Sequence, residues 1–268
     1  MTSPDNDPTP RLDPRLVRTV RERIGLNGDV PVSLAGLSAF YEAWAQNVPF
    51  CSIQKRLHVA TAAPGDFPGA NAEDYLADYL TYGTGGTCFS AGEGIYQMLR
   101  ALGFPARRVA ATMLEFAHLP GINHGSVLVE LPEGMFLVDP FFNSEHPLPL
   151  GDGETAAAKY EPRTVRATAG EDGYRWVIRW RFPFASSWLR CAIAPGDVGV
   201  PRTLFHERYR ASAGPANAFN QGVFISINRG PEVHALYKGA YHVRVPDSPA
   251  ISHPVDLARR NELLETVF

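Results

Sequence analysis

The sequence predicts an α+β protein in which helices and strands occupy separate layers. Apolar residues recur at helical spacing through most of the first hundred residues, whereas short runs rich in β-branched and aromatic residues follow Phe104. The last third mixes further strand-like runs with an amphipathic segment at 254–268. Because the helices come first and the strands later, we do not expect the alternating order of a parallel βαβ sheet.

Four helices are expected before Phe104. The first has Asp13 as its cap and Pro14 at its first helical position. The fourth begins at Cys88, and Gly103 ends it in a left-handed cap. The segment 47–53 interrupts the helical pattern. The expected helices span residues 14–24, 33–46, 72–82 and 88–102.

The expected strands include one hairpin. Its strands are residues 124–131 and 135–139, and the turn is the Pro-Glu-Gly sequence at 132–134. Further strands are expected at 107–114, 176–180, 188–194, 222–228, 232–239 and 241–245. Helices are expected at 201–211 and 254–268.

Composition excludes several classes of function. The net charge of −3 and the lack of a basic cluster argue against a nucleic-acid partner. No apolar run approaches the roughly 18 residues that a membrane span needs. The first residues lack the basic start and apolar middle of a secretion signal, so a cytoplasmic location is expected. Three cysteines without close spacing fit neither a disulfide framework nor a metal site, so no metal is expected.

Cys88 is the strongest candidate for a nucleophile. It opens the fourth expected helix, whose unpaired N–H groups and positive dipole end favour a thiolate. Gly85 and Gly86 lack side chains, which lets a substrate carbonyl approach backbone N–H groups. His124 begins one strand of the expected hairpin and Asp139 ends the other, so their side chains become neighbours. The three groups match the nucleophile, base and orienting acid of a catalytic triad.

Each of these features also has a structural interpretation. A cysteine is more often a small buried apolar residue than a nucleophile, and a glycine pair also makes a tight loop. His124 is one of eight histidines, and Asp139 before Pro140 is also a turn residue. Only the conjunction of all three side chains favours catalysis.

Four segments resemble the arylamine N-acetyltransferase family. The segment 23–50 is similar to the family's opening helices, and GTGGTCFSAGEGIYQMLRALGF at 83–104 resembles its cysteine motif. The segment 124–142 resembles its histidine and aspartate strands, and LLETVF at 263–268 resembles its last helix. The resemblance covers nearly all of the chain after residue 15.

The resemblance implies a three-part fold with a triad like that of cysteine proteases. An N-terminal helical bundle carries the cysteine, a central β-barrel carries the histidine and aspartate, and a C-terminal α/β lid follows. We therefore expect a disordered tail at 1–14, a helical domain at 15–104, a barrel domain at 105–200 and a lid domain at 201–268.

The implied chemistry is ping-pong acyl transfer. Acetyl-CoA serves as acyl donor, Cys88 carries the acyl group as a thioester, and an arylamine or hydrazine accepts it. The implied partners are thus a small amine and a coenzyme A thioester, and a homo-oligomer is left open. Six residues are expected to bind substrate, although core packing explains the aromatic ones equally well. They are Phe50, Gly86, Thr87, Ser126, Phe142 and Phe219.

The sequence departs from the family pattern around the cysteine. Thr84 replaces an arginine, Ser90 replaces a glutamate and Cys51 replaces a second glutamate. Removing a whole set of buried charges can be neutral where removing one is costly, so we expect a repacked site. The loop after Asp139 also differs, and Asn143 is expected to narrow the acceptor pocket.

Three interpretations follow. The first is an acetyl-CoA-dependent arylamine N-acetyltransferase. The second is a related cysteine acyltransferase or amide synthase of a biosynthetic pathway, with another donor or acceptor. The third is a non-catalytic binding protein on the same fold.

Overall fold

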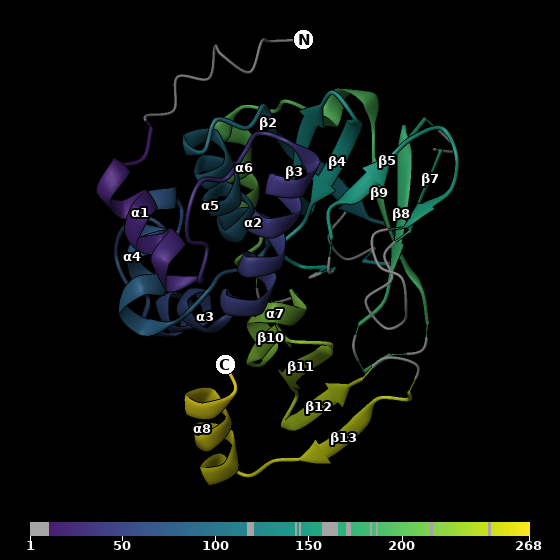
Figure 1. Cartoon of the computed structure of the whole chain (residues 1–268). Coiled ribbons are helices and arrows are strands. Elements are labelled where there is room, and N and C mark those ends of the chain that lie inside the picture. The colour runs from purple at the N-terminus through teal and green to yellow at the C-terminus, as the bar shows by residue number, and fades with distance from the viewer. Residues whose placement is uncertain are drawn as a thin grey trace.

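The computed structural model describes residues 11–116, 121–142, 144, 146–156, 166–169, 173–182, 184–185, 187–214, 217–245 and 248–268. The first ten residues of the expected tail lie outside this set, and the first helix begins at Pro14. The helical part, the strands of the barrel and the C-terminal sheet lie in three regions of the molecule (Figure 1). The predicted α+β class with a helical bundle, a barrel and an α/β lid is confirmed.

The helical part consists of five helices, and a side-chain cap begins the first, second and fourth of them. The Ser33 hydroxyl accepts a hydrogen bond from the N–H of Gly36, and the Asn71 amide oxygen accepts one from Asp74. Gly83 takes the left-handed conformation after the fourth helix. The helices are α1 (Pro14–Arg23), α2 (Leu34–Asn47), α3 (Ile53–Thr61), α4 (Ala72–Tyr82) and α5 (Cys88–Ala101).

Helix α5 is the centre of the packing. Every residue from Cys88 to Leu99 is buried, because α4, α6 and the strands β2 and β3 all pack against this helix. A helix enclosed on all sides carries apolar or small residues around most of its circumference, as this one does in CFSAG, and its buried Glu93 is paired with buried Arg108. Its first turn is therefore held in one place by tertiary contacts.

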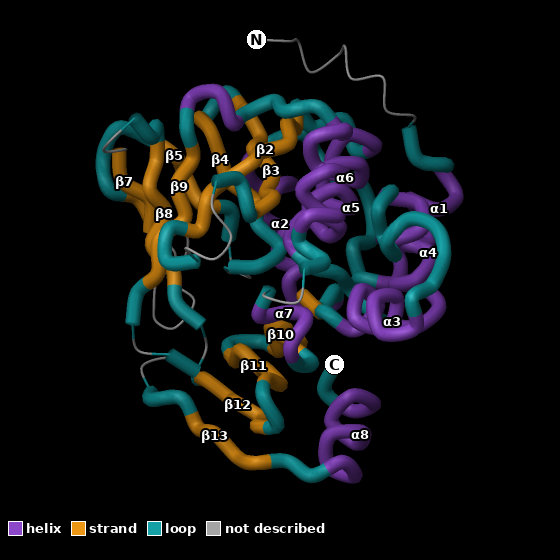
Figure 2. Tube along the Cα trace, turned by 180° about the vertical axis from the view of Figure 1, so that it is seen from behind, coloured by secondary structure: helices purple, strands orange, loops and turns teal. Residues whose placement is uncertain are grey.

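An eight-stranded antiparallel sheet forms the barrel. Its strand order is β5-β4-β3-β2-β9-β8-β7-β6, and the edge strand β5 contacts β6 and β7, so that the sheet curls almost to closure (Figure 2). The strands are β2 (Ala106–Met113), β3 (His124–Leu131), β4 (Gly134–Val138), β5 (Leu148–Leu150), β6 (Thr155–Ala156), β7 (Arg166–Ala169), β8 (Trp176–Trp180) and β9 (Leu189–Ile193).

The C-terminal sheet includes one strand from the N-terminal half of the chain. Its order is β1-β10-β11-β12-β13, and Phe50 of β1 pairs with Ser226 of β10. The strands of this sheet are β1 (Phe50–Cys51), β10 (Phe224–Arg229), β11 (Glu232–Tyr237), β12 (Ala240–Arg244) and β13 (Ile251–Pro254). The helices after the barrel strands are the 3-10 helix Pro195–Asp197, α6 (Arg202–Ala211), α7 (Ala218–Gln221) and α8 (Leu257–Thr266).

The sequence patterns found the long elements and missed the short or atypical ones. The four helices predicted before Phe104 are confirmed as α1, α2, α4 and α5. The β3–β4 hairpin and helices α6 and α8 are confirmed as well. Helix α3 was not predicted, because its apolar residues Leu57 and Val59 are exposed while its buried residue is Lys55. The short strands β1, β5, β6, β7 and β13 were missed as well.

The start of β3 meets the first turn of α5 at a glycine. A Cβ atom at Gly125 would lie 2.6 Å from Cδ1 and 3.2 Å from Cα of Phe89. The second of these neighbours is backbone and cannot move without shifting the helix. Glycine at this position thus allows β3 and α5 to approach closely.

We expect Gly125→Ala to lower the free energy of unfolding by about 1–3 kcal/mol, because the methyl group overpacks the contact. Gly151→Ala is the matched control, since a Cβ there meets nothing within 4 Å. Urea denaturation of both variants measures the difference. An equal effect of the two substitutions would contradict the close approach.

Candidate active site

Cys88 is the first residue of α5 and is 7% exposed. Thr87 precedes it as the N-cap in extended conformation, and its side chain makes no capping hydrogen bond. The first N–H groups of a helix have no helical partner, so the positive end of the α5 dipole acts on Cys88. The sequence prediction that the cysteine opens a helix is confirmed.

The glycine pair before Cys88 has a packing role. A Cβ at Gly85 would lie 1.6 Å from the carbonyl oxygen of Pro49, and one at Gly86 would lie 2.3 Å from the Ser90 hydroxyl. The N–H of Cys51 also donates to the Gly86 carbonyl at 3.0 Å. The pair therefore allows the segment 49–51 to lie directly against the cysteine motif, a reason that the sequence alone did not supply.

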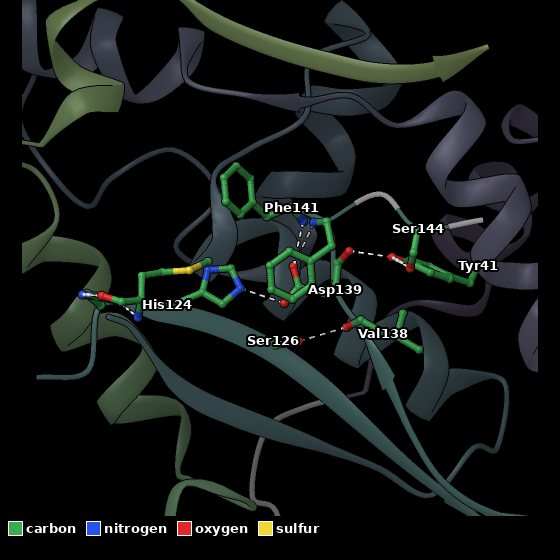
Figure 3. A network of polar contacts seen from close by, with 10 residues as sticks. Tyr41, His124, Ser126, Val138, Asp139, Phe141 and Ser144 are labelled. Carbon is green, nitrogen blue, oxygen red and sulfur yellow. Dashed lines mark hydrogen bonds and ion pairs between the residues drawn. The ribbon is translucent and has the colours of Figure 1, made fainter. Parts of the chain in front are cut away.

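His124 and Asp139 meet at one edge of the β3–β4 hairpin. Nε2 of His124 lies 2.7 Å from Oδ2 of Asp139, and both side chains are almost fully buried (Figure 3). The register that pairs Val127 with Val138 brings the first residue of β3 next to the residue that follows β4. The predicted juxtaposition of imidazole and carboxylate is confirmed as geometry.

Backbone and tyrosine groups hold Asp139 in place. Its Oδ1 accepts hydrogen bonds from the N–H groups of Phe141 at 2.9 Å and Phe142 at 3.3 Å. The hydroxyl of Tyr41 donates to the Asp139 carbonyl oxygen at 2.7 Å and lies 3.2 Å from the Ser144 hydroxyl (Figure 3). Sequence analysis missed Tyr41, whose only signal is that a tyrosine buried on a helix needs a partner for its hydroxyl.

Cys88 and His124 form a hydrogen-bonded pair whose charges support each other. Burial raises the pKa of the Cys88 thiol, but His124, the N–H of Gly125 and the ammonium of Lys55 lower it below its usual value. Burial lowers the pKa of His124, whereas Asp139 and Cys88 raise it to about 10. The lowered thiol pKa and the raised imidazole pKa both favour the ion pair of thiolate and imidazolium. Since Nε2 bonds Asp139, Nδ1 is the nitrogen that faces Cys88.

The other two cysteines differ from Cys88. Cys51 and Cys191 are each 1% exposed, and burial raises the pKa of both thiols. All three cysteines carry free thiols. Only Cys88 combines a lowered pKa with a place on a pocket wall.

A pocket opens beside Cys88 and His124. Of the residues predicted to bind substrate, Phe50, Thr87 and Phe219 line it. The further lining residues are Lys55, Met113, Phe116, Asn123, Phe141, Ser212 and Asn217. Aromatic rings thus dominate its wall, and Phe50 and Phe141 pack with ring centroids 4.7 Å apart.

Three predicted binding residues do not line this pocket. Gly86 lines a second cavity behind the cysteine motif. The Ser126 hydroxyl donates to the Val138 carbonyl at 3.2 Å, and the Phe142 ring stacks on His124 at 5.6 Å between centroids. Asn143 lies outside the described residues, so its predicted effect on the pocket stays a prediction.

Sequence reasoning missed Lys55, a cation in the pocket wall. The residue is 2% exposed, and its ammonium donates to the carbonyl oxygen and the hydroxyl of Ser212 at 2.8 and 2.7 Å. Burial lowers its pKa to about 8, so the ammonium form predominates at neutral pH. Because α3 has no buried apolar face, its sequence lacks the helical periodicity that would have marked Lys55 as buried.

Small polar groups occupy the positions where the family carries charges. The Thr84 hydroxyl lies 3.2 Å from the Gln54 amide, and the Ser90 hydroxyl donates to the Thr87 carbonyl at 3.1 Å. The Cys51 thiol donates to the Gly85 carbonyl at 3.6 Å. Each replacement has a partner, as the prediction of a repacked site requires.

We expect iodoacetamide to label Cys88 at least tenfold faster than Cys51 or Cys191 at pH 7, because only its pKa is lowered. The thiolate is lost only as pH falls through this lowered pKa, so the reaction stays fast below the usual thiol range. His124→Gln removes the imidazolium and shifts the rate profile to higher pH. Peptide mapping by mass spectrometry measures each rate, and equal rates at the three thiols would contradict the pairing.

The described residues contain no helix with the length and apolar character that crossing a bilayer requires. In the same part of the chain no three or more His, Cys, Asp and Glu side chains are grouped to hold a metal ion.

Comparison with known proteins agrees with the acyl-transfer chemistry that the geometry of Cys88, His124 and Asp139 allows. The profile of a family described as N-acetyltransferase matches residues 33–266. A comparison with curated proteins finds no match.

The similar solved structures are arylamine N-acetyltransferases. Arylamine N-acetyltransferase C from Bacillus anthracis is 14% identical with a TM-score of 0.77, over 96% of this chain and 99% of that one. The enzyme from Mycobacterium abscessus is 19% identical with a TM-score of 0.77, over 94% and 88%. The enzyme from Bacillus cereus, described with a unique Cys-His-Glu catalytic triad, is 17% identical with a TM-score of 0.74, over 94% and 97%.

At these identities the structural similarity concerns the fold. The family profile spans most of the chain and reaches across all three parts of that fold. The protein therefore belongs to the N-acetyltransferase family, a family of acyltransferase enzymes, and the resemblance drawn from its motifs is confirmed.

Proposed function

We propose that the protein is an acetyl-CoA-dependent N-acetyltransferase that acts on arylamines or hydrazines by a ping-pong mechanism. The observation that carries this proposal is the hydrogen-bonded series Cys88, His124 and Asp139 beside an aromatic pocket. The Bacillus cereus enzyme is described with a triad in which glutamate stands in the third place, and Asp139 supplies the same carboxylate chemistry here. A cytoplasmic location stays a prediction of the sequence, and the oligomeric state stays open.

In the first half-reaction the Cys88 thiolate attacks the carbonyl carbon of the acetyl thioester. A bond forms between Sγ and this carbon, and the bond from the carbon to the coenzyme A sulfur breaks. The leaving thiolate takes a proton from the His124 imidazolium. The free N–H groups in the first turn of α5 stabilise the oxyanion of the tetrahedral intermediate.

In the second half-reaction the amine nitrogen attacks the thioester on Cys88. Neutral His124 removes a proton from this nitrogen, and the bond from carbon to Sγ breaks. The products are the amide and the original pair of thiolate and imidazolium. Asp139 keeps its charge throughout, fixes the ring orientation and stabilises the imidazolium.

A second function has a specific observation in its favour. The charged ammonium of Lys55 lies in the wall of a pocket that four phenylalanine rings line, which suits a substrate other than a simple apolar arylamine. A related cysteine acyltransferase or amide synthase, with a different donor or acceptor, is therefore the alternative. Membership in a family of enzymes disfavours the third interpretation, a non-catalytic binding protein.

Mixing the protein with acetyl-CoA and no acceptor should add one acetyl group, because the first half-reaction needs no amine. Intact mass measures it. Cys88→Ala should stay unmodified, while Cys191→Ala, which alters a buried thiol outside the pocket lining, should be acetylated. No adduct on the wild-type protein would refute acetyl-CoA as donor, and an adduct on Cys88→Ala would refute the nucleophile.

Asp139→Asn should lower kcat by roughly 10³–10⁴-fold, by analogy with triads in which the orienting carboxylate becomes an amide. The pKa of His124, raised to about 10 mainly by this carboxylate against the effect of burial, should fall toward its usual range. The acetylation rate at pH 6–10 and the thermal midpoint measure both effects. A rate profile identical to that of the wild type would show that Asp139 does not orient the base.

A further inference from the structure

Lys55 is a buried cation, and within the described residues one of its N–H donors has no acceptor. An ammonium has three N–H donors, and the two contacts with Ser212 account for two of them. The Tyr209 ring also lies near the ammonium, with its centroid 5.6 Å from Nζ. Within the described residues no carboxylate forms an ion pair with Lys55, although a buried charge is costly unless it is compensated.

The reaction cycle changes the charge around Lys55. The anionic group that acts on it is the Cys88 thiolate, across the shared pocket. Acylation turns this thiolate into a neutral thioester and therefore removes the compensating charge. A negative group delivered by a substrate restores the balance at the point in the cycle where the protein's own anion is lost.

Thr87 supplies a second donor in the wall of the same pocket. Its side chain is 2% exposed, its hydroxyl has no hydrogen-bond partner, and the residue lines the same pocket. Unpartnered buried hydroxyl groups are rare, because each costs about 1–3 kcal/mol. A ligand oxygen held between the Lys55 ammonium and the Thr87 hydroxyl satisfies both groups.

The distribution of acidic groups decides on which side such an oxygen binds. Lys55 and Thr87 line both the Cys88 pocket and the second cavity. Asp78 lines only the second cavity, where its negative charge repels an anion. Among the described residues no Asp or Glu lines the Cys88 pocket, so an anion is favoured there once acylation has removed the charge of the Cys88 thiolate.

We propose that Lys55 and Thr87 form a carboxylate-binding subsite in the Cys88 pocket, which selects a substrate that carries a carboxylate. The inference rests on the proposed acyl transfer at Cys88 and goes beyond it by naming the chemical class of the preferred substrate. The carboxylate belongs either to the acyl group of the donor or to the acceptor amine. The chemistry of recognition is the same in both cases.

The experiment compares matched substrates in two arms. The donor arm measures acylation of Cys88 by malonyl-CoA and by butyryl-CoA, a neutral thioester of similar size, using intact mass. The acceptor arm measures transfer from acetylated enzyme to 4-aminobenzoate and to its neutral methyl ester. In one arm the wild type should prefer the anion by about tenfold or more in second-order rate constant.

Variants separate the subsite from a general effect on the site. Lys55→Met keeps the length of the side chain and should lower the ratio of anionic to neutral rate about tenfold, whereas Lys55→Arg should retain much of it. Thr87→Val should lower the ratio a few-fold without destabilising the fold, because its hydroxyl has no partner to lose. The arm that shows the effect identifies the source of the carboxylate.

A binding measurement keeps the test independent of turnover. Calorimetric titration should show that benzoate binds more tightly than benzamide to Cys88→Ala, which lacks the thiolate charge as the acylated enzyme does, and that adding Lys55→Met removes the difference. Equal binding of the two compounds, a ratio near one in both kinetic arms, or a ratio unchanged by Lys55→Met would each overturn the subsite. Failure of any thioester to acylate Cys88, with the benzoate preference intact, would instead overturn only the proposed function.

Discussion

The close approach of β3 to the first turn of α5 is the contact on which the site depends. Cys88 belongs to a helix and His124 to a strand, and they become partners only because Gly125 places no side chain against Phe89. The same glycine donates its N–H to the Cys88 sulfur and helps to lower the pKa of the thiol. Glycine at position 125 therefore both allows the close packing against Phe89 and contributes to the lowered pKa of Cys88.

Burial of the Asp139 carboxylate is possible because several donors hold it. Asp139 accepts bonds from His124 and two backbone N–H groups, and its own carbonyl is occupied by Tyr41 from α2. This network joins the helical part to the barrel without exposing the carboxylate to water. Buried polar networks that are fully satisfied in this way fix one arrangement of the elements that contribute to them.

The sequence reveals features that are local and hides those made by tertiary contact. The order of elements and the meeting of His124 with Asp139 were predictable, because helical spacing and a hairpin register are short-range properties. Tyr41 and Lys55 were not, since their partners lie 98 and 157 residues away. The glycine pair was recognised, yet the reason for Gly85 is the carbonyl of Pro49, which only the folded chain brings near.

The pairing of β1 with β10 has a consequence for synthesis of the chain. Phe50 lines the pocket and lies against Phe224, and its strand partner is Ser226. The ribosome synthesises the helical part long before residues 224–229. Until those residues follow, strand β1 has no pairing partner and the Phe50 ring lacks its contact with Phe224. Unpaired edges attract other chains. The reactive thiol therefore acquires its finished surroundings only after residues 224–229 have been synthesised.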